Sequence, residues 1–286
     1  MKNADITLSP KTQFGHVLKH EDPKSDEYVD PGDNLIHCRE CREPREKILD
    51  VFGKDNPIIV PSPCRCQRMK REQEGKEQEE KDRQLRIQKL RSFGVPIRFR
   101  EYTFEKNQDM FDSDKINILK NYVSHIADME KNGEGLLLTG PPRSGKAILG
   151  ACVINALIDM EISAFMRIYP LLPTNVESLE SKARSEFIDN LINCSVLMIA
   201  EFGAEQGSEY AKSILYSIIK ARYMNKKPLI ITTHYTLEEL RNPSQEKDIS
   251  TFNQILECCA PITIPASNIS IAEADRNFRR AKEILT

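Results

Sequence analysis

Residues 136–150, LLLTGPPRSGKAILG, come close to the phosphate-binding pattern G-x-x-x-x-G-K-[ST]. Gly140, Gly145 and Lys146 have the required spacing, after an apolar run typical of a buried strand and before a pattern typical of a helix. In such a loop, backbone N–H groups surround phosphate oxygens, the helix N-terminus adds positive potential and the lysine neutralises phosphate charge. The alternative is a Gly-Pro turn followed by a surface lysine. We expect a nucleotide to bind the residues Gly140, Pro141, Pro142, Arg143, Ser144, Gly145, Lys146 and Ala147.

The magnesium ligands of this chemistry are missing from the sequence. Ala147 replaces the serine or threonine whose hydroxyl coordinates Mg²⁺. The acidic element of a later strand falls in SVLMIAEFGAE, residues 195–205, where Ala200 precedes Glu201. ATPases of this type carry one acid near Mg²⁺ and a second that orients the attacking water. Glu201 remains for the second role, so the sequence predicts nucleotide binding, doubtful Mg²⁺ coordination and weak or no hydrolysis.

A second group of reactive residues consists of four cysteines in two pairs, Cys38-x-x-Cys41 and Cys64-x-Cys66. The span between them contains two strand-like pieces, residues 47–52 and 58–60, separated by a Gly-Pro turn. A hairpin there would bring four thiolates around one tetrahedral Zn²⁺. Unliganded or redox-active thiols are the alternative, and His37 is expected to be incidental. The remaining cysteines have apolar neighbours typical of core positions: Cys152, Cys194, Cys258 and Cys259.

Composition is that of a water-soluble globular protein. The chain has 286 residues, of which 40% are hydrophobic and 29% charged, with a net charge of −2. The charge argues against a polybasic body that binds nucleic acid by charge alone. No apolar run has the length of a signal peptide core or a membrane span. We therefore expect a cytoplasmic protein with reduced cysteines and no membrane partner.

The chain is expected to have three parts. Residues 1–70 form an N-terminal region that carries the zinc module at 36–70, and residues 1–34 are expected to be a flexible lead with some helix. Residues 71–92 are dense in Glu, Gln, Lys and Arg and predict a solvated connecting helix. Residues 93–286 form the nucleotide-binding domain.

In that last part, strand and helix patterns alternate. Continuous apolar strands such as GLLLT, VLMI and LIITT indicate a parallel sheet with helices on both faces. The predicted fold class is therefore α/β. We expect strands at 135–139, 163–168, 196–199, 228–233 and 261–264, and helices at 145–160, 176–192 and 208–225.

Taken in order, these features resemble a known family. The chain resembles the DnaC/DnaI-like bacterial and phage replicative-helicase loaders, AAA+ proteins that are similar to the transposition helper ATPase IstB. The resemblance covers most of the chain: the cysteine module, the charged helix, GPPRSGKA, VLMIAEFGAE with the helix SEYAKSILYSIIKARY, and KPLIITTHYTLEEL. It implies an AAA+ P-loop domain with a central parallel sheet, preceded by a small zinc module and a charged connecting helix.

The resemblance also implies roles for individual residues. Lys146 and its neighbouring amides would hold ATP phosphates, and Glu201 matches the second acid of the Walker B strand. Thr233 and His234 fall at sensor 1, and His234 stands where such proteins commonly have Asn. Arg222 matches an arginine that reaches a neighbouring subunit's nucleotide, with a surface arginine at a helix C-terminus as the alternative. The expected catalytic residues are Glu201, His234 and Arg222, and no sensor 2 arginine is assigned.

The partners implied by the family are a hexameric replicative DNA helicase, bound by the zinc module and connecting helix, and single-stranded DNA, contacted by an oligomeric AAA+ part. The predicted function is an ATP-binding, helicase-loader-like scaffold with weak or no hydrolysis. One alternative is a non-enzymatic adaptor or inhibitor of the helicase, and another is a transposition helper. A nucleotide kinase would need an arginine-rich lid and gives no reason for the cysteine module.

Overall fold

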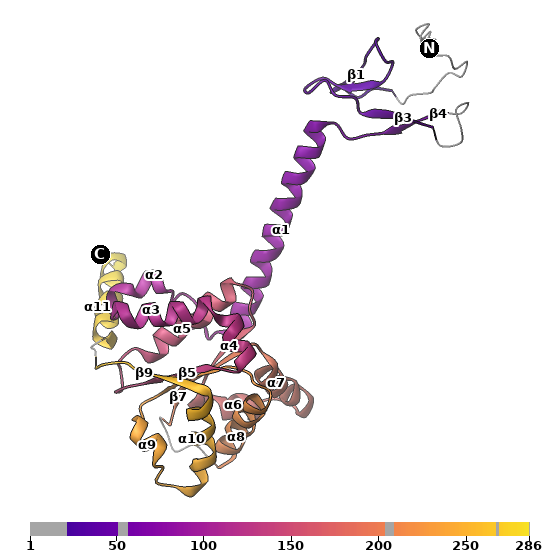
Figure 1. Ribbon diagram of the computed structural model, residues 1–286. Coiled ribbons are helices and arrows are strands. Elements are labelled where there is room, and N and C mark those ends of the chain that lie inside the picture. The colour runs from indigo at the N-terminus through magenta and orange to yellow at the C-terminus, as the bar shows by residue number, and fades with distance from the viewer. Residues whose placement is uncertain (1–21, 51–56, 204–208, 267–268, 286) are drawn as a thin grey trace. The chain divides into compact units, whose positions relative to one another are not determined.

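A computed structural model of the chain describes residues 22–50, 57–203, 209–266 and 269–285 (Figure 1). The chain forms two compact units that divide between Asp82 and Arg83. This division lies inside helix α1 (Arg65–Gly94), which begins in the first unit and ends in the second. The helix thus extends beyond the expected residues 71–92 and includes Cys66 in its first turn. The three-part division of the chain stays a prediction.

The first unit is built from two antiparallel hairpins. One pairs β1 (Glu27–Val29) with β2 (Ile36–Cys38), and the other pairs β3 (Glu46–Asp50) with β4 (Pro57–Pro61). The second hairpin agrees with the strands expected between the cysteine pairs. The first contradicts the expected flexible lead over residues 22–34, because the carboxylate of Asp30 accepts the N–H of Gly32 and stabilises a turn where prolines were taken as breaks. Residues 1–21 lie outside the described residues.

The interior of the first unit is small and largely polar. Its described buried hydrophobic residues are Ile36, Cys38 and Cys64, whereas Glu27, His37, Arg45 and Glu46 are buried polar residues. A unit of this size buries too little apolar surface to be stable by that alone, and such units commonly need metals or disulfides. The packing of this unit therefore depends on its polar contacts and its cysteines.

The second unit contains one parallel sheet of five strands in the order β9-β5-β8-β7-β6. Each expected strand is present, with ends shifted by a few residues. Pro261, which has no N–H to donate, lies on the edge strand, where the sheet tolerates it. The strands are β5 (Gly135–Thr139), β6 (Ala164–Ile168), β7 (Val196–Phe202), β8 (Leu229–Thr233) and β9 (Cys259–Thr263).

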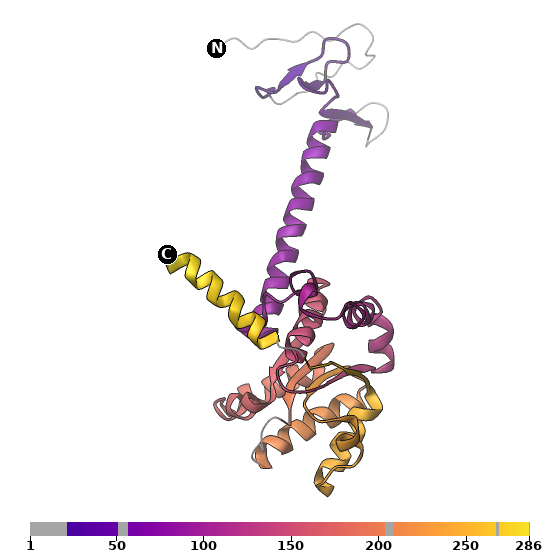
Figure 2. The same cartoon turned by 90° about the vertical axis from the view of Figure 1, so that its left-hand side faces the viewer.

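Helices cover both faces of this sheet, as the two views in Figures 1 and 2 show. On one face, α3 (Ser113–Ser124) and α5 (Lys146–Asp159) enclose a hydrophobic cluster that includes Leu136, Leu138 and Ala200. On the other, α8 (Glu209–Met224) and α10 (Glu246–Cys258) enclose a cluster that includes Leu137. Successive residues of a strand point to opposite faces, so neighbouring strand residues enter different clusters. The predicted α/β class with helices on both faces is confirmed.

The helices are more numerous than expected. The region 176–192, expected as one helix, contains α6 (Leu172–Glu177) and α7 (Ser181–Asn193). The sequence patterns did not predict the helices α2 (Phe104–Asn107), α3, α4 (Ile126–Asn132), α9 (Leu237–Arg241), α10 and α11 (Ile269–Leu285). Three short 3₁₀ turns complete the description: Ile97–Phe99, Gln108–Met110 and Tyr169–Leu171.

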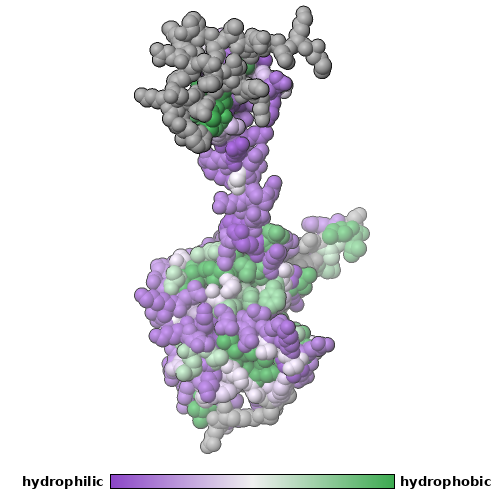
Figure 3. All heavy atoms as spheres, turned by 90° about the vertical axis from the view of Figure 1, so that its right-hand side faces the viewer, coloured by the Kyte–Doolittle hydropathy of each residue, from purple (hydrophilic) through white to green (hydrophobic). Residues whose placement is uncertain are grey.

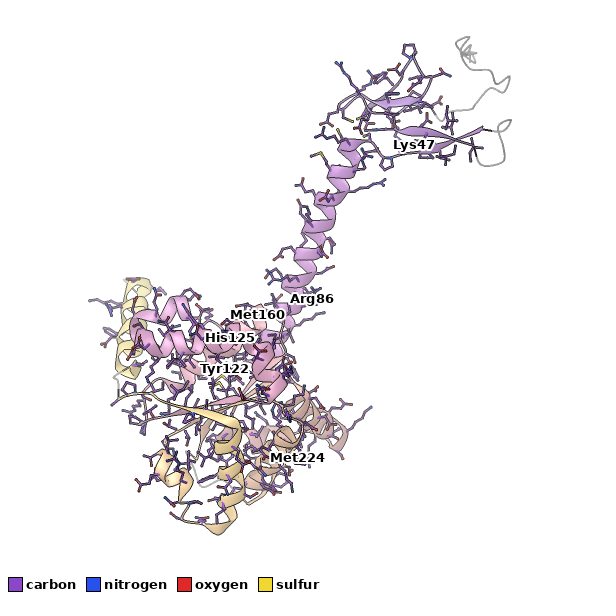
Figure 4. All side chains as sticks on the ribbon, in the orientation of Figure 1. Lys47, Arg86, Tyr122, His125, Met160 and Met224 are labelled. Carbon is purple, nitrogen blue, oxygen red and sulfur yellow. The ribbon has the colours of Figure 1, made fainter. Side chains whose placement is uncertain are left out.

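The last turns of α1 are attached to the sheet. Figure 3 shows the visible surface of α1 as almost wholly hydrophilic, which agrees with the expected solvated helix. Near its end, however, Arg86, which is labelled in Figure 4, pairs with Glu161, which follows α5. The guanidinium of Arg167 on β6 donates to the carbonyls of Phe93 and Gly94 and lies over the ring of Phe93. Within the described residues, no helix is long and apolar enough to cross a membrane.

Candidate functional site

The loop between β5 and α5 has the backbone of a phosphate-binding loop. Its residues Gly140, Arg143 and Gly145 have φ of 146°, 64° and 82°, a region that disfavours residues with a Cβ. A Cβ on Gly140 would lie 2.2 Å from the carbonyl oxygen of Ile264, and one on Gly145 would lie 2.6 Å from the ring of Phe111. Only glycine fits these two positions, so the spacing in the sequence reflects a geometric requirement.

Lys146 folds back over this loop. Its Nζ donates to the carbonyl oxygens of Gly140 and Pro141 at 2.8 and 2.7 Å and to the hydroxyl of Ser144 at 3.1 Å. Burial lowers the pKa of Lys146, and the negative charge of Glu201 acts in the opposite direction. The ammonium is thus held at the place where a bound phosphate would be expected, and its bonds to the loop can be exchanged for bonds to phosphate oxygens.

The loop forms one wall of a cavity of about 640 Å³ at the carboxyl ends of the strands. This is where parallel α/β sheets bind ligands. The cavity has the size of a small-molecule site. Its lining combines the loop with strand-end residues that the sequence singled out, Glu201, Thr233 and His234, and with the half-buried Ile168. The structure thus brings the predicted phosphate loop, acid and sensor residue to one cavity.

Glu201 lies at an irregularity near the end of β7. Its φ is 61°, and the pairing of β7 with β8 shifts register between Ile199 and Phe202. The N–H of Glu201 donates to the hydroxyl of Thr232 at 3.0 Å, which fixes this unusual backbone. The side chain is exposed and lines the cavity, so it can face a bound ligand.

The two alanines offer no oxygen to a metal ion. Ala147 lines the cavity and packs against the hydrophobic cluster under α5. Ala200 is completely buried in that same cluster. A Mg²⁺ ion in this cavity would therefore lack ligands from both of these positions and would depend more on phosphate oxygens and water.

His234 follows β8 at the rim of the cavity. Its ring lies 4.7 Å from the ring of Tyr235. The preceding Thr233 is buried, donates its hydroxyl to the carbonyl of Phe202 and accepts the N–H of Tyr235. These bonds tie the end of β8 to the end of β7, so His234 and Glu201 are held on adjacent strand ends.

The cysteine pairs meet in the first unit. The Sγ atoms of Cys38, Cys41 and Cys64 all lie within 4.8 Å of one another. Cys66 lies beside Cys41. The hydrogen bond from the backbone N–H of Cys66 to the sulfur of Cys41 is the main cause that lowers the pKa of Cys41, to about 6. The proximity of Cys41 in turn raises the pKa of Cys66 to about 12. A cluster of soft sulfur donors, with N–H groups directed at a thiolate, fits Zn²⁺.

His37 lies beside this cluster but bonds elsewhere. Its Nδ1 is 2.9 Å from the carbonyl oxygen of Arg42, and its Nε2 is 2.9 Å from the carboxylate of Asp33. Burial lowers the pKa of His37, but the bonds to Arg42 and Asp33 together outweigh it and leave a raised value. Both ring nitrogens are therefore engaged away from the sulfur atoms.

Comparison with known proteins identifies the family. Residues 67–259 match the family described as IstB-like ATP binding protein. The chain belongs to this family. This IstB-like protein is also similar to the replicative helicase loader DnaC of Escherichia coli (strain K12), 24% identical over 129 residues that cover 44% of this chain and 53% of DnaC. The uncharacterized protein YqaM of Bacillus subtilis (strain 168) is 28% identical over 133 residues, 41% of each chain.

The chain spans about half the length of the curated relatives it matches. Among solved structures, the crystal structure of DnaI is similar with a TM-score of 0.51 and 21% identity, covering 59% of this chain and 94% of DnaI. This likeness concerns the fold alone. The parallel sheet of the IstB-like protein, flanked by helices, is therefore an AAA+ fold, and the sequence-based expectation of that fold and family is confirmed.

Arg222 requires a correction. It was expected either to reach a neighbouring subunit or to lie on the surface at the end of a helix. Instead its side chain is 0% exposed. Its guanidinium donates to the carbonyl oxygens of Leu191, Ile192, Cys194, Ser195 and Pro228, at 2.6 to 3.1 Å.

The bonds of Arg222 give it a structural place inside the IstB-like domain. Its five carbonyl partners lie in residues 191–195, which connect α7 to β7, and at Pro228 before β8, so one side chain of α8 joins two other stretches of the chain. It does not lie where a neighbouring nucleotide could contact it. A helix-end arginine next to a buried strand looks the same in the sequence whether it points outward or inward, which is why both interpretations were wrong.

Sequence reasoning missed one wall of the cavity. Arg98, Phe99 and Tyr102 line it from the segment that follows α1. Asn155, on α5, donates its side-chain amide to the carbonyls of Phe99 and Tyr102 at 2.8 and 2.9 Å, which fixes this segment against the loop helix. The only signal was the run of arginine and aromatic residues in IRFREYTF, which has no recognisable spacing.

Proposed function

We propose that this chain is an ATP-binding, helicase-loader-like protein that engages a replicative DNA helicase during DNA replication and hydrolyses ATP weakly or not at all. The observation that carries the proposal is the cavity itself, with Lys146 and a loop that requires glycine at two positions on one wall and no oxygen ligand at Ala147 or Ala200. The similarity to the helicase loader DnaC supports the choice of partner.

Within this proposal, the loop residues 140–147 bind the ATP phosphates through backbone N–H groups and the ammonium of Lys146. Glu201 orients the attacking water, and His234 contacts the γ-phosphate from the adjacent strand end. Hydrolysis needs Mg²⁺ held at the phosphates. Without ligands from Ala147 and Ala200 the ion would be held less firmly, which would slow the reaction without preventing binding.

The cysteine cluster would hold one structural Zn²⁺ through Cys38, Cys41, Cys64 and Cys66. Through these cysteines a bound ion would join the end of β2, the following turn and the start of α1. The zinc module and α1 would bind the hexameric helicase. The AAA+ part would oligomerise and contact single-stranded DNA, in the cytoplasm.

Binding and turnover can be tested separately. Calorimetry of the full chain with ATP is expected to give binding with and without Mg²⁺, and co-purification with a hexameric replicative helicase is expected to depend on ATP. Heat of mixing that is absent in both conditions, together with intact helicase binding, would favour the alternative of a non-enzymatic adaptor or inhibitor. DNA binding without any helicase binding would favour a transposition helper.

The metal ligands can be restored. The double variant Ala147→Thr and Ala200→Asp is expected to raise the ATPase rate above that of the natural chain. The single variant Ala200→Asp is the matched control, because it places the same carboxylate in the core and lowers stability without restoring the hydroxyl at position 147. A double variant that folds, binds ATP and shows no gain in rate would contradict the idea that the missing ligands limit hydrolysis.

A further inference from the structure

The side chain of Arg45 lies against the cysteine cluster. Its Nη2 donates to the Sγ of Cys38 at 3.3 Å. The Sγ of Cys64 lies within 4.8 Å of the Sγ of Cys38. The guanidinium therefore contacts the cluster at Cys38, next to a sulfur atom of the second cysteine pair.

The same guanidinium also bonds to the first hairpin. Its Nη1 donates to Glu27 at 2.7 Å and to Asp26 at 2.8 Å. The side chain of Arg45 is 9% exposed and that of Glu27 is 11% exposed, so this pair is shielded from water, whereas Asp26 is exposed. A planar guanidinium with several fixed donors can bond carboxylates and sulfur at once, which the single ammonium of lysine cannot do with the same geometry.

The backbone of Arg45 is fixed between the two cysteine-bearing segments. Its N–H donates to the carbonyl of Ile36, two residues before Cys38, and its carbonyl accepts the N–H of Ser62, two residues before Cys64; both bonds are 2.7 Å long. These two backbone bonds fix the position of Arg45 relative to both cysteine pairs. They therefore place its side chain beside the sulfur atoms.

These contacts answer an electrostatic need of the proposed metal site. Four thiolates around one Zn²⁺ carry a net charge of −2 in a partly buried position. Burying charge without a compensating partner is costly, and residues that hydrogen-bond to metal ligands fix their orientation and tune the metal. Among the described residues, Arg45 is the buried cation next to the cluster.

We infer that Arg45 is a positioning residue for the metal of the cysteine cluster, which orients the Cys38 thiolate, offsets the charge of the cluster and links metal binding to the hairpin of β1 and β2. This inference depends on the zinc site of the proposed function. It assigns to Arg45 a role in retaining the metal that a purely structural ion pair with Glu27 would not have.

Zinc release from the full chain tests the inference. Arg45→Gln is expected to lose zinc to an excess of a chromogenic chelator about 10- to 100-fold faster than the natural chain. Arg45→Lys keeps the charge but not the planar donors, and its release rate is expected to lie in between. Two matched controls keep the natural rate: Arg39→Gln, whose side chain bonds the Glu27 carbonyl, and Lys47→Gln, whose exposed side chain lies on β3 (Figure 4).

A spectroscopic readout separates a metal role from a merely structural one. With ¹¹³Cd in place of zinc, both Arg45 variants are expected to shift the cadmium resonance, because a hydrogen bond to a coordinating sulfur is lost or altered, and the controls are expected to leave it in place. Where Arg45→Gln does not fold, Arg45→Lys decides. Natural release rates and an unmoved resonance in the folded Arg45 variants would overturn the inference. A natural chain that holds no zinc would overturn the zinc proposal first, and this inference with it.

Discussion

The two units of the molecule are stabilised in different ways. The sheet of the second unit lies between two large hydrophobic clusters, one on each face. The first unit buries one aliphatic side chain among its described residues, Ile36, and otherwise polar groups and thiols. Burial of apolar area stabilises the second unit whatever is bound, whereas the first depends on contacts among charges and sulfur atoms. Ligand removal and mutation should therefore affect the two units separately.

Metal removal is expected to have the largest effect. Structural zinc contributes about 10–16 kcal/mol of apparent binding free energy in small zinc-folded peptides. Chelation should therefore unfold the hairpins of the first unit and leave the sheet of the second intact. Hydrogen exchange of the full chain would show loss of protection in residues 27–50 and unchanged protection in β5. Unchanged protection in both units would contradict the comparison, and recovery on adding zinc is the control.

Replacement of Arg222 is expected to destabilise the second unit only. Arg222→Met removes five donated hydrogen bonds from buried carbonyls and should cost about 3–5 kcal/mol. Urea unfolding of the sheet measures this loss, and zinc content should not change. Arg241→Met, at an exposed position on α9, is the matched control. A loss below about 1 kcal/mol would mean that water replaces the guanidinium at these carbonyls.

Removal of the loop cation is expected to change binding without changing stability. Lys146→Ala should weaken ATP binding by about 1.5–3 kcal/mol, roughly 10- to 100-fold, because charge-assisted hydrogen bonds to phosphate are lost. Calorimetry measures the change, and Lys226→Ala, at an exposed position after α8, is the control. Equal affinity in the natural chain and Lys146→Ala would place the phosphates away from this loop.

The smallest expected effect is at the start of α9. Thr236 and Glu239 form a reciprocal capping box, with bonds of 3.2 Å from the Glu239 N–H to the threonine hydroxyl and 2.7 Å from the Thr236 N–H to the carboxylate. Thr236→Ala should cost about 1 kcal/mol in urea unfolding of the second unit, whereas Thr236→Ser keeps the hydroxyl and should cost less. An equal loss in both variants would show that the methyl group, not the cap, matters.

The features that could be predicted from the sequence are those that depend on residues close together in the chain. The strand–loop–helix around Lys146 was predictable because glycine is required at two positions, and the strands because their apolar runs are continuous. The cysteine cluster was predictable from spacing. The placement of Glu201 and His234 beside the loop was predicted from the family resemblance. The residue patterns around these two positions indicate strands but not which strands are neighbours in the sheet.

Long-range contacts were not predictable in this way. The pocket residues Arg98, Phe99 and Tyr102 depend on Asn155, more than fifty residues away, which fixes their backbone. Arg222 depends on carbonyls of residues 191–195 and of Pro228, and the stretch 191–195 comes close to Arg222 only in the folded sheet. The first hairpin was missed because its strands are three residues long, too short for a periodic signal.

The attachment of α1 has a mechanical consequence. Helix C-terminal carbonyls normally face water, but those of Phe93 and Gly94 bond to the guanidinium of Arg167, which three phenylalanine rings surround. The C-terminal end of α1 is therefore fixed to strand β6. Force applied along it reaches strand β6 directly, and the next residue of that strand, Ile168, belongs to the wall of the nucleotide cavity.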